Sequence, residues 1–331
     1  MRVFVHEFVT SGALIGAALP PSLLREGVAM RRAVVADLLR VEGVRVVSTR
    51  DERAPSVALA GLAEVCVPSA EREAELFRGL AEECDFTLVI APELGDELAR
   101  RVARAVEAAG AERVLNSPRL IAAASDKWET CARLRAAGVP TIETCLASKN
   151  DWRGWDRPVM KPRDGAGSQG VMRVECGAVP GGPGGAPDGW IVQPFVSGRW
   201  LSCTLMFGRN GVAVFPPAEQ RIAGDGTFTY LGGVVPAECD VEGVQRLAER
   251  AIEALCPGEE IVGPVGFDLV EVDGSGELLV CEVNPRFTTS YVGARELASG
   301  NLLAGLIDPE ARPITWRRGR VEFDAEGRIS M

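Results

Sequence analysis

The stretch Val265–Asn284, VGFDLVEVDGSGELLVCEVN, contains two apolar segments on either side of the four residues DGSG. Glycine, aspartate and serine favour tight turns, so the stretch predicts a β-hairpin. In that hairpin Asp268 lies opposite Glu282, and Asn284 shares the face of Glu282 because side chains alternate along a strand. The hairpin therefore predicts two carboxylates and an amide gathered on one patch.

Asp268, Glu282 and Asn284 are candidate metal ligands. Neighbouring carboxylates repel each other unless a cation lies between them. Mg²⁺ prefers oxygen ligands and usually shares its coordination shell with phosphate and water, with Mn²⁺ as the alternative ion. The other interpretation is a hairpin whose acidic residues face solvent. It is disfavoured because Val270 and Val280 are expected on the same face, and an acidic group among apolar side chains needs a partner.

The composition describes a globular chain without the marks of a nucleic-acid or membrane partner. Its 331 residues are enough for two or three compact units, and its net charge of −10 would repel nucleic-acid phosphates. Nine cysteines without a CxxC motif indicate reduced thiols in a cytoplasm. The single histidine, His6, largely excludes multi-histidine zinc sites and histidine-based triads. No apolar run reaches the roughly 18 residues of a membrane span.

Strand and helix patterns alternate along the first part of the chain. From Val3 to Leu115 this alternation predicts a doubly wound α/β domain over residues 1–115. Ser117–Gly138 is expected to be mostly helical, with Lys127 near its middle.

A glycine-rich loop, KPRDGAGSQG at Lys161–Gly170, contains a formal GxGxxG pattern. A dinucleotide fingerprint requires a helix directly after the loop, and that alternative predicts a dehydrogenase. Val171–Val174 has a strand pattern instead, so the loop is interpreted as a strand–loop–strand lid over phosphates. Glycine lets backbone N–H groups approach oxyanions closely, while a lysine offers a compact charge. The candidate phosphate-binding residues are Lys161, Gly165, Gly167, Ser168 and Gly170.

The segment QPFV at Gln193–Val196 is a candidate adenine slot at a strand end. Pro194 has no N–H, so its carbonyl and the Val196 N–H are the natural backbone pair for an adenine edge. The side chains of Gln193 and Phe195 complete the slot. The alternative is an ordinary edge strand that contains a proline.

These motifs together resemble the ATP-grasp superfamily of carboxylate–amine ligases over roughly residues 115–295. The motifs are Asp126-Lys127, Lys161 with its glycine loop, the hinge Gln193–Gly198, Gly266-Phe267-Asp268 and Glu282–Arg286. The resemblance implies an ATP-grasp fold of mixed α/β and α+β character. In it, residues 1–115 form the preceding domain, residues 116–192 the central subdomain with the lid, and residues 193–331 the C-terminal subdomain with the metal site.

Two segments narrow the resemblance. Glu7–Gly12 and Asn284–Tyr291 look most like the ligases that couple tyramine to L-glutamate in methanofuran biosynthesis. One departure concerns the glutamate that binds ribose in many superfamily members shortly after the hinge. Here Ser197–Ser202 contains no glutamate, so the ribose contact stays unassigned.

The resemblance implies that ATP, a carboxylate and an amine give an amide, ADP and phosphate through an acyl phosphate. Lys127 and Lys161 would bind the phosphates of ATP, and the hairpin ligands would hold one or two Mg²⁺ ions. Arg286 would stabilise the acyl phosphate and the tetrahedral oxyanion, so Arg286 and Lys161 are the expected catalytic residues. Other amino-acid or peptide ligases of the superfamily remain alternatives.

Substrate contacts are expected beyond Arg286. Thr288, Thr289 and Ser290 are candidates for binding the donor or the acceptor, with loop capping as the alternative. Arg221 is a candidate for holding a substrate carboxylate, with a surface salt bridge as the alternative. The expected partners are therefore small molecules, and a homodimer is left open. A nucleotide-binding regulatory module with a degenerate grasp is the rival function, motivated by Arg199-Trp200 at the departure from the family pattern.

Overall fold

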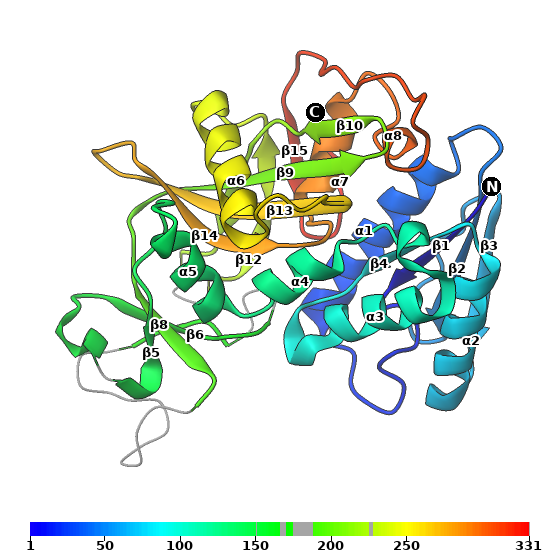
Figure 1. The fold of residues 1–331 in the computed structure, drawn as a ribbon, viewed down its shortest axis with the longest axis horizontal. Helices are drawn as coiled ribbons and strands as arrows, with labels where there is room; N and C mark the ends of the chain where they lie inside the picture. The colour runs from blue at the N-terminus through cyan, green and yellow to red at the C-terminus, as the bar shows by residue number, and fades with distance from the viewer. Residues whose placement is uncertain (150, 166–169, 175–187, 225–227, 331) are drawn as a thin grey trace.

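The computed structural model describes residues 1–149, 151–165, 170–174, 188–224 and 228–330. The described residues form three β-sheets, and Figure 1 shows them as separate units with helices packed on two of them. The N-terminal sheet lies at one end of the molecule and a small sheet lies at the other, with the large sheet between and above them. Among the described residues, no helix is both long enough and apolar enough to cross a bilayer.

The N-terminal domain is doubly wound, as expected. Its four parallel strands have the order β3-β2-β1-β4. Helix α1 packs on one face of the sheet, whereas α2 and α3 pack on the other. The elements are β1 (Arg2–Glu7), α1 (Pro21–Leu38), β2 (Arg45–Asp51), β3 (Leu62–Val67), α2 (Ala70–Glu83), β4 (Phe86–Ile90), α3 (Glu97–Ala109) and the 3₁₀ turns η1 (Leu94–Asp96) and η2 (Ala111–Arg113).

The small sheet is antiparallel and contains the glycine loop. Its strands are β5 (Cys145–Leu146), β6 (Pro158–Pro162), β7 (Met172–Arg173) and β8 (Trp190–Pro194), in the order β5-β8-β6-β7, with 3₁₀ turns η3 (Ala147–Lys149) and η4 (Asp151–Gly154). Strands β6 and β7 flank the loop and pair through Val159 and Arg173. The strand–loop–strand prediction is therefore confirmed, and the dinucleotide alternative lacks the helix that it requires.

The large sheet consists of eight strands in the order β14-β13-β9-β11-β12-β15-β16, with β10 paired to β9. Helices α4, α5 and α6 lie over one face, and α6 stands above β13 in Figure 1. The elements are α4 (Pro118–Ala124), α5 (Lys127–Ala136), β9 (Gly198–Gly208), β10 (Gly211–Val214), β11 (Ala218–Ile222), β12 (Tyr230–Val235), α6 (Val241–Leu255), β13 (Gly263–Val272), β14 (Leu278–Asn284), α7 (Ser290–Ala294), η6 (Arg295–Leu297), α8 (Ala304–Ile307), β15 (Val321–Asp324) and β16 (Ile329–Ser330).

The helix expected over Ser117–Gly138 is two helices. Asp126 caps the second of them, because its carboxylate accepts hydrogen bonds from the N–H groups of Trp128 and Glu129. Lys127 is consequently the first residue of α5 rather than a mid-helix residue. Its N–H donates to the carbonyl of Arg163, which ties the start of this helix to the base of the glycine loop.

The sheet boundaries differ from the expected division at residues 192 and 193. Strand β8 runs through that point to Pro194 and belongs to the small sheet. In addition, α4 and α5 share a core with α6 and the large sheet, although they precede the small sheet in the chain. Leu120 and Leu134 are completely buried in this core.

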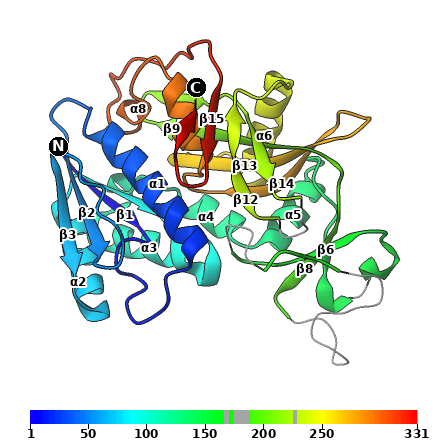
Figure 2. The ribbon, with the colours of Figure 1, turned by 180° about the vertical axis from the view of Figure 1, so that it is seen from behind.

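The N-terminal domain and the end of the chain share one core. Val34 and Leu38 of α1 are buried in the same cluster as Tyr291 and Leu306. Figure 2 shows α1 running beside β15 and the C-terminal helices. Asp37 on α1 accepts hydrogen bonds from Tyr291 and Arg295, which reinforces this contact. Groups from both ends of the chain are thereby held around a common pocket.

Candidate active site

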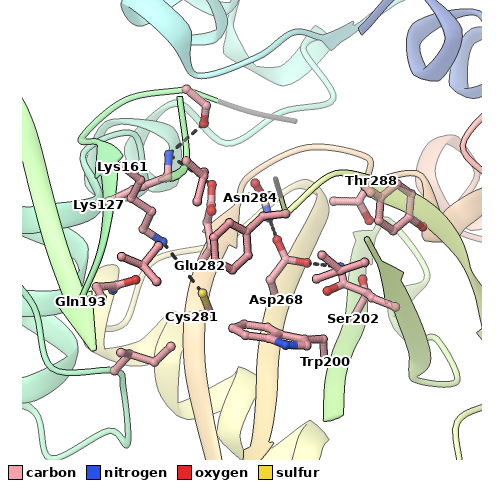
Figure 3. Close-up of a pocket in the computed structure, with 18 of the residues that line it drawn as sticks. Lys127, Lys161, Gln193, Trp200, Ser202, Asp268, Cys281, Glu282, Asn284 and Thr288 are labelled. Carbon is pink, nitrogen blue, oxygen red and sulfur yellow. Dashed lines mark hydrogen bonds and ion pairs between the residues drawn. The ribbon is translucent and has the colours of Figure 1, made fainter. Parts of the chain in front are cut away.

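A pocket lies between the small sheet, the large sheet and the N-terminal domain, and most of the sequence-predicted site residues line it (Figure 3). These residues are Lys127, Lys161, Gly165, Gln193, Pro194, Phe195, Val196, Asp268, Glu282, Asn284, Arg286, Thr288, Thr289 and Ser290. Gly167 and Ser168 lie outside the described residues. Gly170 does not line the pocket but turns the chain into β7 with a φ of 73°, beside Pro162 and Trp190.

The hairpin register matches the sequence prediction at the polar positions. Asp268 pairs with Glu282, and Gly266 pairs with Asn284. Gly266 leaves room for Thr288, because a Cβ at Gly266 would lie 2.4 Å from the Thr288 methyl group. The predicted patch of two carboxylates and an amide is therefore present, and Thr288 fills the space beside it.

A β-bulge changes the hairpin beyond Asp268. Leu269 pairs with Val280, so Cys281 is the additional residue of β14. The expectation that Val280 shares the face of Glu282 was wrong, because the bulge directs Val280 into the core beneath the helices. Cys281 instead lines the pocket beside Glu282, and sequence reasoning missed it because no residue type in ELLVCEVN marks a bulge.

Asp268 is held by two amide groups. The Gln220 Nε2 and Asn284 Nδ2 atoms donate to its two carboxylate oxygens over 2.7 and 2.9 Å. Burial and the nearby Glu282 carboxylate raise the pKa of Asp268 to about 6, so the positive charge near Asp268 does not offset these two effects. Burial also acts to raise the pKa of Glu282, but Lys127 and Lys161 lower it below its ordinary value.

The donor set suits Mg²⁺. It combines two carboxylates with one amide oxygen, and oxygen ligands are what Mg²⁺ prefers. Among the described residues, no three His, Cys, Asp or Glu side chains gather as a metal-binding group. An ion held by Asp268, Glu282 and Asn284 would therefore keep several coordination positions for phosphate and water, which is usual for Mg²⁺.

Replacing Asp268 with asparagine is expected to stabilise the protein without divalent cations by roughly 3 kcal/mol at pH 7, because a desolvated carboxylate and its repulsion from Glu282 are removed. The folded-state pKa of Asp268 exceeds its unfolded value. The penalty is therefore complete above about pH 6 and absent below about pH 4. Melting temperatures in chelator should diverge across this range, with the variant higher. A variant that melts below the wild type at pH 7 would contradict the expectation.

The two lysines lie on the side of the carboxylates that faces the small sheet, as Figure 3 shows. The Lys127 ammonium donates to the Gly165 carbonyl over 2.8 Å and lies 3.2 Å from the Glu282 carboxylate. The Lys161 ammonium lies 3.9 Å from the Cys281 sulfur. Burial acts to lower the pKa of Lys161, but Cys281 and Glu282 raise it above its ordinary value, so Lys161 stays charged. Two buried cations therefore face the lid and the carboxylates.

Arg286 is fixed by a residue of the N-terminal domain that sequence reasoning missed. Its Nε and Nη2 atoms donate to the Glu93 carboxylate over 3.0 Å each, and both side chains are nearly buried. Burial acts to lower the pKa of Arg286, but Glu93 and Glu282 raise it. Glu93 follows the carboxyl end of β4, where sites gather in parallel sheets. The position of Glu93 after a buried parallel strand could have marked it as a candidate site residue. Nothing in the sequence could have indicated its pairing with Arg286.

The candidate adenine slot lies at the end of β8. The Gln193 side chain donates to Thr144 over 2.9 Å, which fixes its orientation. The guanidinium groups of Arg157 and Arg173 each lie 5.0 Å from the centre of the Phe195 ring. Pro194 and Val196 line the pocket beside it, so an aromatic and apolar wall faces the lysines.

Hydroxyl groups occupy the other side of the carboxylates. Thr288 and Ser290 share a hydrogen bond of 2.9 Å, and Ser202 donates to Ser290 over 3.2 Å. Arg221 does not join them. It alternates with Gln220 along β11, pairs with Glu322 at 2.8 Å, and leaves its side chain 48% exposed. Its position does not support the expected role in holding a substrate carboxylate.

Comparisons with known proteins identify relatives across the whole chain. Residues 124–290 match the family model described as ATP-grasp domain, and residues 44–119 match the pre ATP-grasp 3 domain. The tyramine–L-glutamate ligase of Methanocaldococcus fervens is 25% identical over 214 residues, which are 65% of this chain and 62% of that enzyme. The match thus spans less than two thirds of the length of that relative.

Solved structures share the fold. A putative ATP-grasp superfamily protein from Archaeoglobus fulgidus is 25% identical with a TM-score of 0.73, covering 98% of this chain and 92% of that one. The N5-carboxyaminoimidazole synthetase from Staphylococcus aureus, complexed with ADP, is 14% identical with a TM-score of 0.68. That match covers 97% of this chain and 82% of the synthetase.

Proposed function

Because the chain belongs to the ATP-grasp family, we propose that it is an ATP-dependent ligase that joins a carboxylate to an amine. The reaction would pass through an acyl phosphate and release ADP and phosphate. One observation carries the proposal. Two buried lysines, two facing carboxylates and a nearly buried arginine line a single pocket between the domains.

The arrangement suits phosphoryl transfer followed by acyl transfer. Lys127 and Lys161 would bind the ATP phosphates, with the adenine against Gln193–Val196 and the glycine loop above. Asp268, Glu282 and Asn284 would hold Mg²⁺, which stabilises charge on the β- and γ-phosphates. The fixed guanidinium of Arg286 would bind oxygens of the acyl phosphate and then the oxyanion that forms when the amine attacks.

The lid would keep water from the acyl phosphate. Asp164, at the start of the loop, accepts a hydrogen bond of 2.8 Å from the Gly95 N–H in the N-terminal domain. This contact ties Asp164 to the N-terminal domain, and Asp164 itself lines the pocket. Exclusion of water would favour attack by the amine over hydrolysis.

We propose L-glutamate as the acid and tyramine as the amine, by analogy with the Methanocaldococcus relative. The departure at Arg199-Trp200 does not favour the rival regulatory module. Arg199 pairs with Glu271 on the neighbouring strand, whereas Trp200 lines the pocket without displacing a lysine or a carboxylate.

The direct test is ADP release by the purified protein with Mg-ATP. Release is expected only when both an acid and an amine are present, and the product should show the mass of the amide. Glutamate with tyramine is the first pair to test, followed by other amino acids and primary amines. Binding of ATP without acid-dependent ADP release across the panel would support the regulatory module instead.

A further inference from the structure

Glu26 lines the same pocket as Asp268 and Arg286, but it takes no part in binding the phosphates or the metal ion. It projects from α1 in the N-terminal domain. The next residue, Gly27, allows α1 to lie close to the end of β1, because a Cβ there would be 2.7 Å from the Glu7 carboxylate. Glu7 is itself held by the N–H and hydroxyl groups of Thr10. The position of Glu26 is therefore fixed by the packing of its helix.

The Glu26 carboxylate is largely buried, and the two guanidinium groups whose charge reaches it, those of Arg286 and Arg25, form their salt bridges with other carboxylates. Thr289 donates a hydrogen bond to it over 3.3 Å, and no ion pair within the described ranges includes it. Burial raises the pKa of Glu26, and the field of Arg286 only partly offsets this effect. Arg286 is already committed to Glu93. A buried carboxylate in this situation is costly unless a ligand supplies the positive charge.

The groups around Glu26 can accept hydrogen bonds. Tyr230, Thr288 and Ser290 line the same pocket as Glu26, each with a hydroxyl group. Figure 3 shows Thr288 and Ser202 on the side of Asp268 that lies away from Lys127 and Lys161. The pocket is thus cationic at the lysine end, which suits phosphates. Its other end is anionic and rich in hydroxyl oxygens, which suits a group with several N–H donors.

We infer that Glu26 binds a protonated amino group of a substrate at the end of the pocket opposite the lysines. The inference rests on the proposed ligase function and adds the charge that its substrate carries. Two sources share this chemistry, the α-ammonium group of an amino-acid donor and the ammonium form of the acceptor amine. With either source, Glu26 would direct the bound molecule toward Arg286.

The test compares ligands that are positively charged at the amino position with analogues of similar shape that are uncharged at that position, in the presence of Mg²⁺ and a non-hydrolysable ATP analogue. Glutamate is paired with glutarate, which lacks the amino group, and tyramine with 4-(2-hydroxyethyl)phenol, which has a hydroxyl in its place. Dissociation constants are measured by calorimetry for the wild type and Glu26→Gln. The wild type should prefer one charged ligand, and Glu26→Gln should weaken that ligand about 10- to 100-fold.

The glutamate pair reports on the donor and the tyramine pair on the acceptor. Glu42→Gln, an exposed change in the loop after α1, should bind every ligand as the wild type does. Affinity for the ATP analogue should be unchanged in both variants, which shows that the fold is intact. If Glu26→Gln unfolds, the preference of the wild type for charged over uncharged ligands still tests whether the pocket binds an ammonium group.

The inference is overturned if the wild type binds neither charged ligand, if it does not distinguish charged from uncharged ligands, or if Glu26→Gln retains the preference. ADP release by the wild type, measured with the same acids and amines, reports separately on the ligase function. Release without a charge preference would remove the role of Glu26 and leave the ligase in place.

Discussion

Glu282→Gln is expected to reduce amide-forming turnover at least about 10³-fold while leaving the fold intact. Glu282 faces Asp268 across the hairpin and lies 3.2 Å from the Lys127 ammonium. The change removes one of two anionic metal ligands. A bound metal ion contributes several kcal/mol of charge stabilisation in the transition state, and each 1.4 kcal/mol is about a tenfold change in rate.

Nucleotide binding should respond differently from turnover. Without the carboxylate, Lys127 loses its anionic partner and can turn fully toward the phosphates. Affinity for ATP in chelator is therefore expected to stay the same or to rise, while the gain in affinity on adding Mg²⁺ should shrink. Calorimetric titrations with and without Mg²⁺, together with single-turnover ADP release, measure the two effects separately.

Glu277→Gln provides the matched control, because Glu277 begins the same segment of the hairpin and is exposed. Its turnover should equal that of the wild type. A Glu282→Gln variant whose turnover remained within tenfold of the wild type would show that Glu282 does not hold the ion.

The hairpin illustrates what local sequence can predict. The DGSG turn and the two-residue period of a strand are local properties, and they predicted that Asp268 faces Glu282. The bulge that brings Cys281 into the pocket depends on how β14 packs beneath the helices, and no residue type announces it. The sequence could therefore predict which residues of β13 and β14 share a face only as far as the regular pairing of these two strands continues.

The fold shows the same difference between features that depend on local sequence and features that depend on tertiary packing. The N-terminal domain was predicted because its buried parallel strands are continuous apolar runs, such as the completely buried β4. Strand β12 was missed because Gly232 and Gly233 interrupt its pattern. Those glycines are needed for close approach, since a Cβ at Gly232 would lie 2.1 Å from the Phe323 carbonyl oxygen. Tertiary contact, rather than strand propensity, stabilises that element.

The partner of Arg286 lay beyond local reasoning for another reason. Glu93 and Arg286 are 193 residues apart in the chain, and tertiary contacts such as the shared core of α1 and α7 bring their domains together. The motif around Arg286 predicted a phosphate-facing arginine. It did not predict that the N-terminal domain orients the guanidinium, which makes that domain part of the site.

Arg286→Ala is expected to lower turnover about 10³- to 10⁵-fold, the range found when an arginine that stabilises transferring phosphoryl groups is removed. It should also destabilise the protein, because Glu93 remains buried without a partner. Breaking a buried ion pair on one side costs about 3–5 kcal/mol. Steady-state ADP release and chemical denaturation measure the two losses.

A second change at Glu93 separates the structural effect of Arg286 from its catalytic effect. Arg286→Ala combined with Glu93→Gln removes the unpaired buried charge, so most of the lost stability should return. Turnover should remain at the level of Arg286→Ala, since no guanidinium faces the acyl phosphate. Glu93→Gln alone should lower turnover by about 10- to 100-fold, because the arginine keeps its charge but loses part of its orientation. If the double variant regained turnover together with stability, Arg286 would serve only to hold the domains together and the proposed chemistry would lose its central cation.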